Sequence, residues 1–382
     1  MHDPVLAAAM LAVVYVALAV AHGWSDHWGQ THRQACAKGG PGRAGRLACL
    51  AHVATLTATK VGLLAVVAAV LGLELPVLAT VAALLLDAVS HYWADRRVTL
   101  AALADAVGKG VFYRMGAPRP GRDDAPHIGT GAYSLDQSWH QAWLLVAALI
   151  IAAPSAVAPW VGAVAVLALA VAVALAEHQL RAERRAGPRC CGTSVGALIF
   201  DEAGRLLMVT RGWRPWGIAP VAGHAADEQQ GGPMAALAAE IREEVGLVLG
   251  RAEMVLTGHR PNLCASRPNP VAPGHYWTIY RATATGTLTP AAGETTGAAW
   301  YTPGQVEALA QQTIDYAHGR VTDAEYEAQP GLEAVWVAHL AALGYLTVDE
   351  ADLDAVEALY TTPPPQYWNG ADEDETAFTT AA

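Results

Sequence analysis

Apolar residues dominate the first half of the chain and fall into five stretches. They cover residues 5–21, 48–73, 76–93, 138–153 and 156–176. A helix that spans a bilayer needs ~20 mostly apolar residues, and these lengths fit, the fourth only if its helix begins near Ser134. Pro154 and Pro159 interrupt the last two stretches, so we expect a helical hairpin there. No basic segment precedes the first stretch, unlike in a cleaved secretion signal. The pattern predicts an α-helical membrane bundle of about five spans.

Lysine and arginine are distributed unevenly among the loops between these stretches. The long loops after the first, third and fifth stretches are basic, whereas the two tight loops, "GLELP" and "PSAVAP", contain neither residue. Cytoplasmic loops of membrane proteins carry the excess of positive charge. We therefore expect a multi-pass protein of the cell membrane with the N-terminus outside and the C-terminal domain in the cytoplasm.

The composition agrees with a protein that is partly in the bilayer. Charged residues make up 15% of the 382 residues and hydrophobic residues 53%, whereas soluble domains average about 25% charged residues. The net charge of −11 argues against nucleic acid as a partner, which would need a basic face. The five cysteines form no CxxC pair, and an odd number suits a disulfide framework poorly. We expect free thiols in a reducing compartment.

Histidines and acids recur at a spacing of four near the ends of the predicted spans. Residues four apart share one face of a helix, and the inferred topology places these at the cytoplasmic ends of spans one to four. Converging imidazoles and carboxylates suit a divalent metal. The residues of this candidate metal site at the membrane edge are His22, Asp26, His52, His91, Asp95, Asp136 and His140. The alternative is that these residues have only a structural role, because polar residues also gather at membrane interfaces and histidines cap helix ends.

Lys60 lies deeper, within the second span, where an unpaired charge is costly. Asp87 on the third span is the candidate partner. A structural ion pair is favoured over a role in transport.

The spacing H-x3-D-x3-Q, then H-x3-D, then D-Q-x2-H resembles an uncharacterised family of small bacterial membrane proteins. The resemblance covers about residues 5–150 and rests on short motifs. It implies no firm activity.

The pattern changes at Thr193 from long apolar runs to short strands and turns. "TSVGALIF" alternates, "DEAG" is a turn, and "RLLMVTRG" is typical of the second arm of a hairpin. "WGIAPVAG", "AEMVLTGHR", "HYWTIYRATAT" and "GAAWYTP" predict further strands, with helices at about 233–246, 303–312 and 332–343. This order predicts a mixed α/β sandwich. The expected divisions are 1–180 for the membrane domain, 181–191 for a basic linker, 192–346 for the sandwich, 347–360 for a helix and 361–382 for a disordered acidic tail.

The segment "AAEIREEVGL" gathers three carboxylates on one predicted helix. Glu240, Glu243 and Glu244 are spaced i, i+3 and i+4, and like charges at this spacing weaken a helix unless a cation compensates them. Hard divalent ions take carboxylate oxygens and often bridge them to substrate phosphates. The alternative is a solvated acidic face paired with Arg242.

At this point the segment resembles the Nudix hydrolase family. Gly223 matches the opening glycine of the family's box, and Glu240, Ile241, Glu243, Glu244, Gly246 and Leu247 match its second half. Ala239 stands where the family has arginine, Gly231 stands where it has glutamate, and the stretch between Gly223 and Glu240 is two residues longer. The resemblance covers about residues 192–346. It implies that Glu240, Glu243 and Glu244 hold Mg²⁺ or Mn²⁺ and that a nucleoside diphosphate linked to another group is cleaved.

Several residues are candidates for the remaining roles in such a reaction. Glu243 or Glu244 could orient the attacking water, and Glu294, just before a strand, is a third candidate. Arg211 and His224 are candidate phosphate or ribose contacts beside Gly223, and Trp216 is a candidate for stacking on a base, with structural packing as the alternative for each.

Two functions follow from these observations. The first is a membrane-anchored, cytoplasm-facing Nudix hydrolase that acts on a small nucleotide or diphosphate substrate. The second is a nucleotide sensor with an impaired active site, which regulates a metalloenzyme or transporter-like activity of the membrane half. Spans that serve only as an anchor remain a third option.

Overall fold

The chain divides into two compact units. The computed structural model describes residues 4–122, 124, 129–211, 216–225, 232–264, 266–291 and 295–362. One unit comprises Met1–Ala117 and Pro126–Ala186, and the other comprises Pro118–Ala125 and Gly187–Ala382. From residue 363 on, the tail for which disorder is expected lies outside the described residues.

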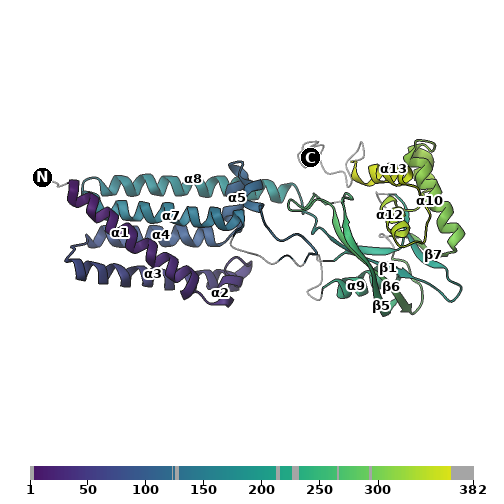
Figure 1. Ribbon diagram of the computed structural model, residues 1–382, viewed down its shortest axis with the longest axis horizontal. Coiled ribbons are helices and arrows are strands. Elements are labelled where there is room, and N and C mark those ends of the chain that lie inside the picture. The colour runs from purple at the N-terminus through teal and green to yellow at the C-terminus, as the bar shows by residue number, and fades with distance from the viewer. Residues whose placement is uncertain are drawn as a thin grey trace. The chain divides into compact units, whose positions relative to one another are not determined.

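The first unit is built from helices that pack side by side (Figure 1). They are α1 (Pro4–Trp24), the π-helix η1 (Ser25–Gly29), α2 (His32–Ala37), α3 (Gly42–Leu71), α4 (Val77–Asp95), α5 (Val98–Ala106), α6 (Gly110–Arg114), α7 (Gly131–Ala152) and α8 (Ala158–Arg185). Leu18 of α1, Leu84 of α4 and Leu144 of α7 belong to one buried apolar core. The long helices therefore form a bundle.

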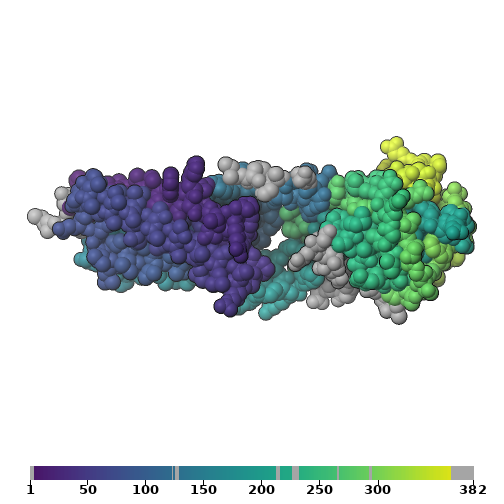
Figure 2. All heavy atoms as spheres, turned by 90° about the horizontal axis from the view of Figure 1, so that it is seen from below, coloured from purple at the N-terminus to yellow at the C-terminus, as the bar shows by residue number. Residues whose placement is uncertain are grey.

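The helices of this bundle expose apolar side chains and bury charged ones. Val66 and Leu85 are 59% and 62% exposed, whereas Lys60 and Asp87 are buried. Figure 2 shows the heavy atoms of this unit from another side, with the N-terminal helices in purple to blue. Soluble monomers rarely expose large apolar patches, and charged groups in membrane helices face the bundle interior. The distribution is that of helices associated with a membrane.

Four helical segments in the described part of the chain are long and apolar enough to cross a membrane. They are Pro4–Gly29, Gly42–Leu71, Val77–Asp95 and Ala158–Arg185. The prediction of about five spans also counts the fourth apolar stretch. The fourth apolar stretch does form a helix, α7, but its first half carries Asp136, Gln137 and His140, which lower its hydrophobicity.

The second unit contains two sheets and five helices among the described residues. The strands are β1 (Thr193–Ile199), β2 (Leu206–Arg211), β3 (Ile218–Ala219), β4 (Val221–His224), β5 (Val248–Arg260), β6 (His275–Thr285) and β7 (Thr295–Tyr301). The helices of this unit are α9 (Pro233–Val245), α10 (Pro303–Ala317), α11 (Asp323–Ala328), α12 (Ala334–Ala342) and α13 (Glu350–Thr361), which makes five. The strand orders are β4-β1-β6-β5 and β3-β2-β7, so the mixed α/β fold is confirmed.

Two details of the predicted strands are wrong. β1 and β2 are not the arms of one hairpin, because they lie in different sheets, and the bridge between Phe200 and Leu206 joins the segments next to them. "WGIAPVAG" is not one strand either, since it splits at Pro220 into β3 and β4, one in each sheet. Proline has no N–H to continue a ladder, and the break moves the chain from one sheet to the other.

Helices cover the sheets through two apolar cores. Leu237 and Ile241 of α9 pack with Val195 of β1 in one core. Trp336 of α12 packs with Trp277 of β6 in the other, to which α10 and α13 also contribute. The first core fixes the rotation of α9 and hence the directions of its glutamates.

We expect His339 to make the second unit acid-sensitive. This buried imidazole packs on Trp277 and Trp336, and neither of its nitrogens has a hydrogen-bond partner among the described residues. Burial, with a contribution from Arg260, lowers the pKa of His339 to about 3. The folded state therefore stays neutral while the unfolded state gains a proton below about pH 6.5. The stability contributed by neutral His339 is present above that pH and is lost as pH falls toward 3.

The comparison of wild type with His339→Leu tests this expectation. Between about pH 6.5 and 5 the wild type should lose ~2 kcal/mol more of unfolding free energy than the variant, at ~1.4 kcal/mol per pH unit. Thermal unfolding of the full chain in detergent at several pH values measures the difference. Equal pH dependence of the two proteins would contradict it.

Candidate functional site

Helix α9 carries the three glutamates and ends where the sequence indicates. It begins at Pro233, which needs no N–H partner in the first turn. Gly246 follows it with a φ of 70°, and its N–H donates to the carbonyl of Arg242. Glycine adopts this left-handed conformation without strain, so the predicted C-cap is confirmed. Leu237, Ile241 and Val245 are buried, and the glutamates lie on the flanks of this apolar face.

Glu240 lies directly against the backbone of β4. A Cβ atom placed on Gly223 would come within 1.9 Å of Oε1 of Glu240. A side chain at this position would displace the Glu240 carboxylate, so glycine permits the close approach. The two ends of the box-like pattern, far apart in the sequence, thus meet in space.

Glu244 lies one helical turn further along and lines a small cavity. The cavity has a volume of about 20 Å³, about the size needed for one water molecule. Its lining residues are Val209, Arg211, Ala219, Pro220, Ala222, Glu244, Thr295 and Glu333. Arg211, a candidate phosphate contact, therefore shares a cavity with Glu244.

Glu333 is a buried acid of this cavity that the sequence analysis missed. Its Oε2 lies 3.6 Å from Nη1 of Arg211, and its backbone N–H donates to the carbonyl of Ile218. Burial raises the pKa of Glu333, and the positive charge of Arg211 opposes the rise. It precedes α12 within a hydrophobic segment, and nothing in its local pattern distinguishes it from a helix-capping residue.

Glu243 points in a different direction from the other two glutamates. Its side chain is 43% exposed and its Oε1 lies 3.4 Å from Nη2 of Arg242. Among the described residues, three groups bring at least three His, Cys, Asp or Glu ligand atoms within 4.8 Å of one another, and none includes these glutamates. The carboxylate donors suit Mg²⁺ or Mn²⁺, but Glu243 has to turn inward to join Glu240 and Glu244.

The remaining candidates of this domain are distributed as follows. The indole N–H of Trp216 is buried and has no hydrogen-bond partner among the described residues. His224, at the end of β4, turns its Nε2 toward Cys190 and Cys264. Glu294 lies outside the described residues.

The histidines and aspartates of the first unit converge. They come from the end of α1 and η1, the first half of α3, the end of α4 and the start of α7. Nε2 of His52 lies 3.2 Å from Asp26 and 3.4 Å from Asp95, and Nε2 of His91 lies 3.2 Å from Asp95. The ligand atoms of Asp26, His52 and His91 form one candidate metal group. His91 and Asp95 form a second one with His140.

The other members of this cluster complete a buried polar core. His140 stacks on His91 at 3.8 Å between ring centroids, and its Nε2 lies 3.3 Å from Asp136. His22 is 1% exposed and neither of its nitrogens has a hydrogen-bond partner among the described residues. Asp26 lies on the π-helix, a feature that is frequent at functional sites.

Lys38 supplies one positive charge to the cluster. Its Nζ lies 2.9 Å from Asp95 and 3.6 Å from Asp26. With Asp136 the cluster has three carboxylates against this one ammonium, so ionised carboxylates and neutral histidines leave two negative charges. A divalent cation would balance them, and the donor set fits one.

Lys60 and Asp87 form the ion pair that the sequence predicts. The ammonium of Lys60 donates to Oδ2 of Asp87 deeper in the bundle, and both residues are buried.

The comparisons with known proteins concern the second unit. A family model described as NUDIX domain matches residues 192–323. A search of curated proteins finds no match. Similar solved structures include a NUDIX hydrolase from Nitrosomonas europaea, with 17% identity over 34% of this chain and 88% of that chain and a TM-score of 0.26. The NUDIX domain of NrtR from Shewanella oneidensis, complexed with ADP ribose, has 16% identity over 34% and 88% and a TM-score of 0.26. A MutT NUDIX hydrolase from Burkholderia pseudomallei has 20% identity over 31% and 85% and a TM-score of 0.24.

At these identities and TM-scores, none of the solved structures indicates an activity for this chain. The family match agrees with the region in which Gly223 and the glutamates of α9 meet. Residues 192–323 of this chain form a NUDIX domain.

Proposed function

We propose that the chain is a membrane-anchored, cytoplasm-facing Nudix-type hydrolase. Its substrate would be a nucleoside diphosphate linked to another group, and its cofactor Mg²⁺ or Mn²⁺. The observation that carries the proposal is the contact between Glu240 and the backbone of Gly223, with Glu244 on the same side of α9. The NUDIX match supports the reaction class.

The side chains around the cavity have distinct roles in this proposal. Glu240 and Glu244 would hold the cation, with Glu243 turning inward to join them. The bound cation would screen the phosphate charge and activate a water molecule. Arg211 would bind a phosphate oxygen, and Glu333, 3.6 Å away, would position it. Glu243, Glu244 or Glu294 would orient the water, and Trp216 would stack on the base.

The orientation in the membrane follows from charge. The basic loops lie after the first, third and fifth apolar stretches, and positive loops stay in the cytoplasm. The NUDIX domain follows the last of them, so it would face cytoplasmic nucleotides.

An assay of the full chain in detergent tests this function. The substrates are nucleoside diphosphate sugars, dinucleotides and ADP-ribose, and chromatography measures the released nucleotide. Turnover is expected with Mg²⁺ or Mn²⁺ and not when divalent ions are omitted. A complete absence of product from the whole series would contradict hydrolysis.

A second candidate function is a metal-dependent activity of the membrane unit, regulated by a nucleotide-sensing NUDIX domain. The convergence of His22, Asp26, His52, His91 and Asp95 favours it. Both nitrogens of buried His22 lack a hydrogen-bond partner among the described residues, and the excess of carboxylate charge suits a cation. In this case nucleotides would bind and stabilise the chain without being cleaved.

We expect His91→Ala to remove one equivalent of divalent metal from the full chain. His91 belongs to both candidate metal groups of the membrane unit, so its loss affects both. His178→Ala, an exposed histidine on α8, is the matched control. Elemental analysis after dialysis gives the metal content. Identical content in wild type, His91→Ala and His178→Ala would leave Lys38 as the only cation of the cluster.

A further inference from the structure

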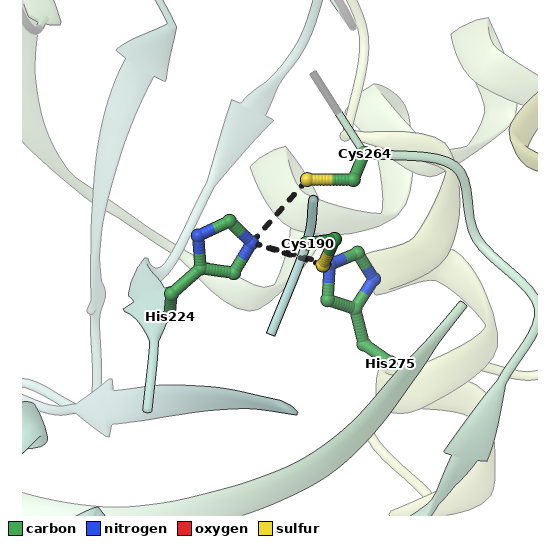
Figure 3. A group of neighbouring side chains, drawn as sticks. All are labelled: Cys190, His224, Cys264 and His275. Atoms are coloured by element: carbon green, nitrogen blue, oxygen red, sulfur yellow. Dashed lines mark hydrogen bonds between the residues drawn. The ribbon is translucent and has the colours of Figure 1, made fainter. Parts of the chain in front are cut away.

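We propose that Cys190, His224, Cys264 and His275 form a structural zinc site in the second unit. Their four ligand atoms all lie within 4.8 Å of one another. Figure 3 shows the four side chains pointing toward one another from separate segments of the chain. The site is independent of the hydrolase proposal, because it shares no residue with the glutamates of α9.

The sheet topology brings these four residues to one end. β1 and β6 are parallel neighbours, so they start at the same end of the sheet. Cys190 lies just before β1, and His275 is the first residue of β6. β4 and β5 run antiparallel to β1 and β6, so their last residues lie at that same end of the sheet. His224 is the last residue of β4, and Cys264 follows the end of β5.

The distances match those between the ligands of a tetrahedral zinc ion. With the usual Zn–N and Zn–S bond lengths, two nitrogens lie ~3.3 Å apart and a nitrogen and a sulfur ~3.6 Å apart. Nε2 of His224 lies 3.3 Å from Nε2 of His275. It also lies 3.6 Å from Sγ of Cys190 and 3.3 Å from Sγ of Cys264. Nε2 of His275 lies 3.1 Å from Sγ of Cys190.

Hydrogen bonds alone do not explain this arrangement. Nε2 of His224 is close to two sulfurs and to another Nε2, yet a ring nitrogen offers one proton or one lone pair. Nδ1 of His275 lies 3.2 Å from the carbonyl of Asn262 and must donate its proton there. In neutral His275, Nε2 then carries a lone pair, which is directed at the centre of the group. A cation at the centre satisfies all four atoms together.

The surroundings of the four residues are those of metal ligands. Metal-bound histidines usually donate their other N–H to a carbonyl or carboxylate, as His275 does. The backbone N–H of Gly192 donates to Sγ of Cys190 over 3.2 Å, and that of Ser266 donates to Sγ of Cys264 over 3.3 Å. Both donors lie two residues after the cysteine, and both bonds favour a thiolate. Two sulfurs and two nitrogens in a tetrahedron select zinc.

Four protein ligands leave no open position, so the role is structural. The ion would fasten the segment between β5 and β6 to the start of β1 and the end of β4. The sequence analysis missed the site because each ligand stands alone in the sequence, without the CxxC or HxxxH spacing that marks zinc motifs.

Cobalt substitution in the full chain tests the proposal. Co²⁺ bound by thiolates gives a near-ultraviolet charge-transfer band, which the cluster of the membrane unit cannot produce because its candidate ligands contain no sulfur. Wild type should bind one Co²⁺ with this band, and Zn²⁺ should displace it. Cys190→Ser and Cys264→Ser should lose most of the band. Cys191→Ser should keep it, because Cys191 is not one of the four converging residues and its Sγ contacts Thr193.

Thiol labelling of the wild type covers the case in which the serine variants fail to fold. Cys190 and Cys264 should resist alkylation until a chelator is added, whereas exposed Cys36 should react throughout. The proposal is overturned if wild type shows no thiolate band, if the band is equal in all three serine variants, or if a reductant rather than a chelator releases the two cysteines.

Discussion

Replacing Glu244 by glutamine is expected to lower kcat of the proposed hydrolase by about 10²-fold or more. Removing one electrostatic partner of a reaction centre typically costs a factor of this order. Glutamine keeps the shape of the side chain but loses its negative charge. Glu244 lines the cavity together with Arg211, the proposed phosphate contact, so its charge lies beside the proposed reaction centre. The rate of nucleotide release at saturating substrate is the measurement.

Two further variants make this result specific. Glu243→Gln should also lower kcat, but less, because its side chain is 43% exposed and must turn inward. Glu307→Gln, an exposed glutamate on α10, should behave as wild type. Unchanged kcat in both Glu244→Gln and Glu243→Gln would exclude the proposed site. Nucleotide binding without turnover in the wild type would instead favour the sensor.

Replacing Asp87 by asparagine is expected to destabilise the membrane unit by about 3–5 kcal/mol. That is the usual cost of removing one partner of a buried ion pair, because the other charge remains uncompensated. Lys60 is 0% exposed and Asp87 is its partner. Thermal unfolding of the full chain in detergent, followed by fluorescence-detected size exclusion, measures the loss.

The double variant Lys60→Met/Asp87→Leu should recover most of the lost stability, since apolar residues of similar volume can replace a buried pair. Asp105→Asn is the matched control. Asp105 pairs with Arg114 over 2.8 Å, but both side chains are partly exposed, so its loss should cost at most ~1 kcal/mol. Equal Tm shifts in Asp87→Asn and Asp105→Asn would contradict a structural role for the deeper pair.

Local patterns were enough to predict most elements of the fold. Apolar length predicted the long helices, and alternation predicted β1 and β6. α7 is less apolar than the other long helices, because its first half carries polar residues of the cluster, such as Asp136 and His140. The split at Pro220 and the separation of β1 from β2 depend on which sheet each strand joins. That choice is decided by packing between distant segments, which a local pattern does not contain.

The candidate sites show the same limit. The histidines and aspartates of the membrane unit were predictable because i, i+4 spacing fixes a helix face and the topology places the faces at one depth. The resemblance to a known box singled out Gly223 and Glu240, but only the fold shows that they meet. Glu333 and the four zinc ligands had no such signal. Each stands alone in its segment, and only the tertiary fold makes it a neighbour of the others.

Gly223 and His224 are consecutive residues of β4, and consecutive residues of a strand face opposite sides. One side receives the Glu240 carboxylate and the other supplies Nε2 to the cysteines. The two faces of this short strand thus adjoin two different proposed metal sites, the carboxylates of α9 on one side and the Cys/His group on the other. If both proposed sites hold, loss of the ion beside His224 would loosen this strand and disturb the neighbouring backbone of Gly223, against which Glu240 lies.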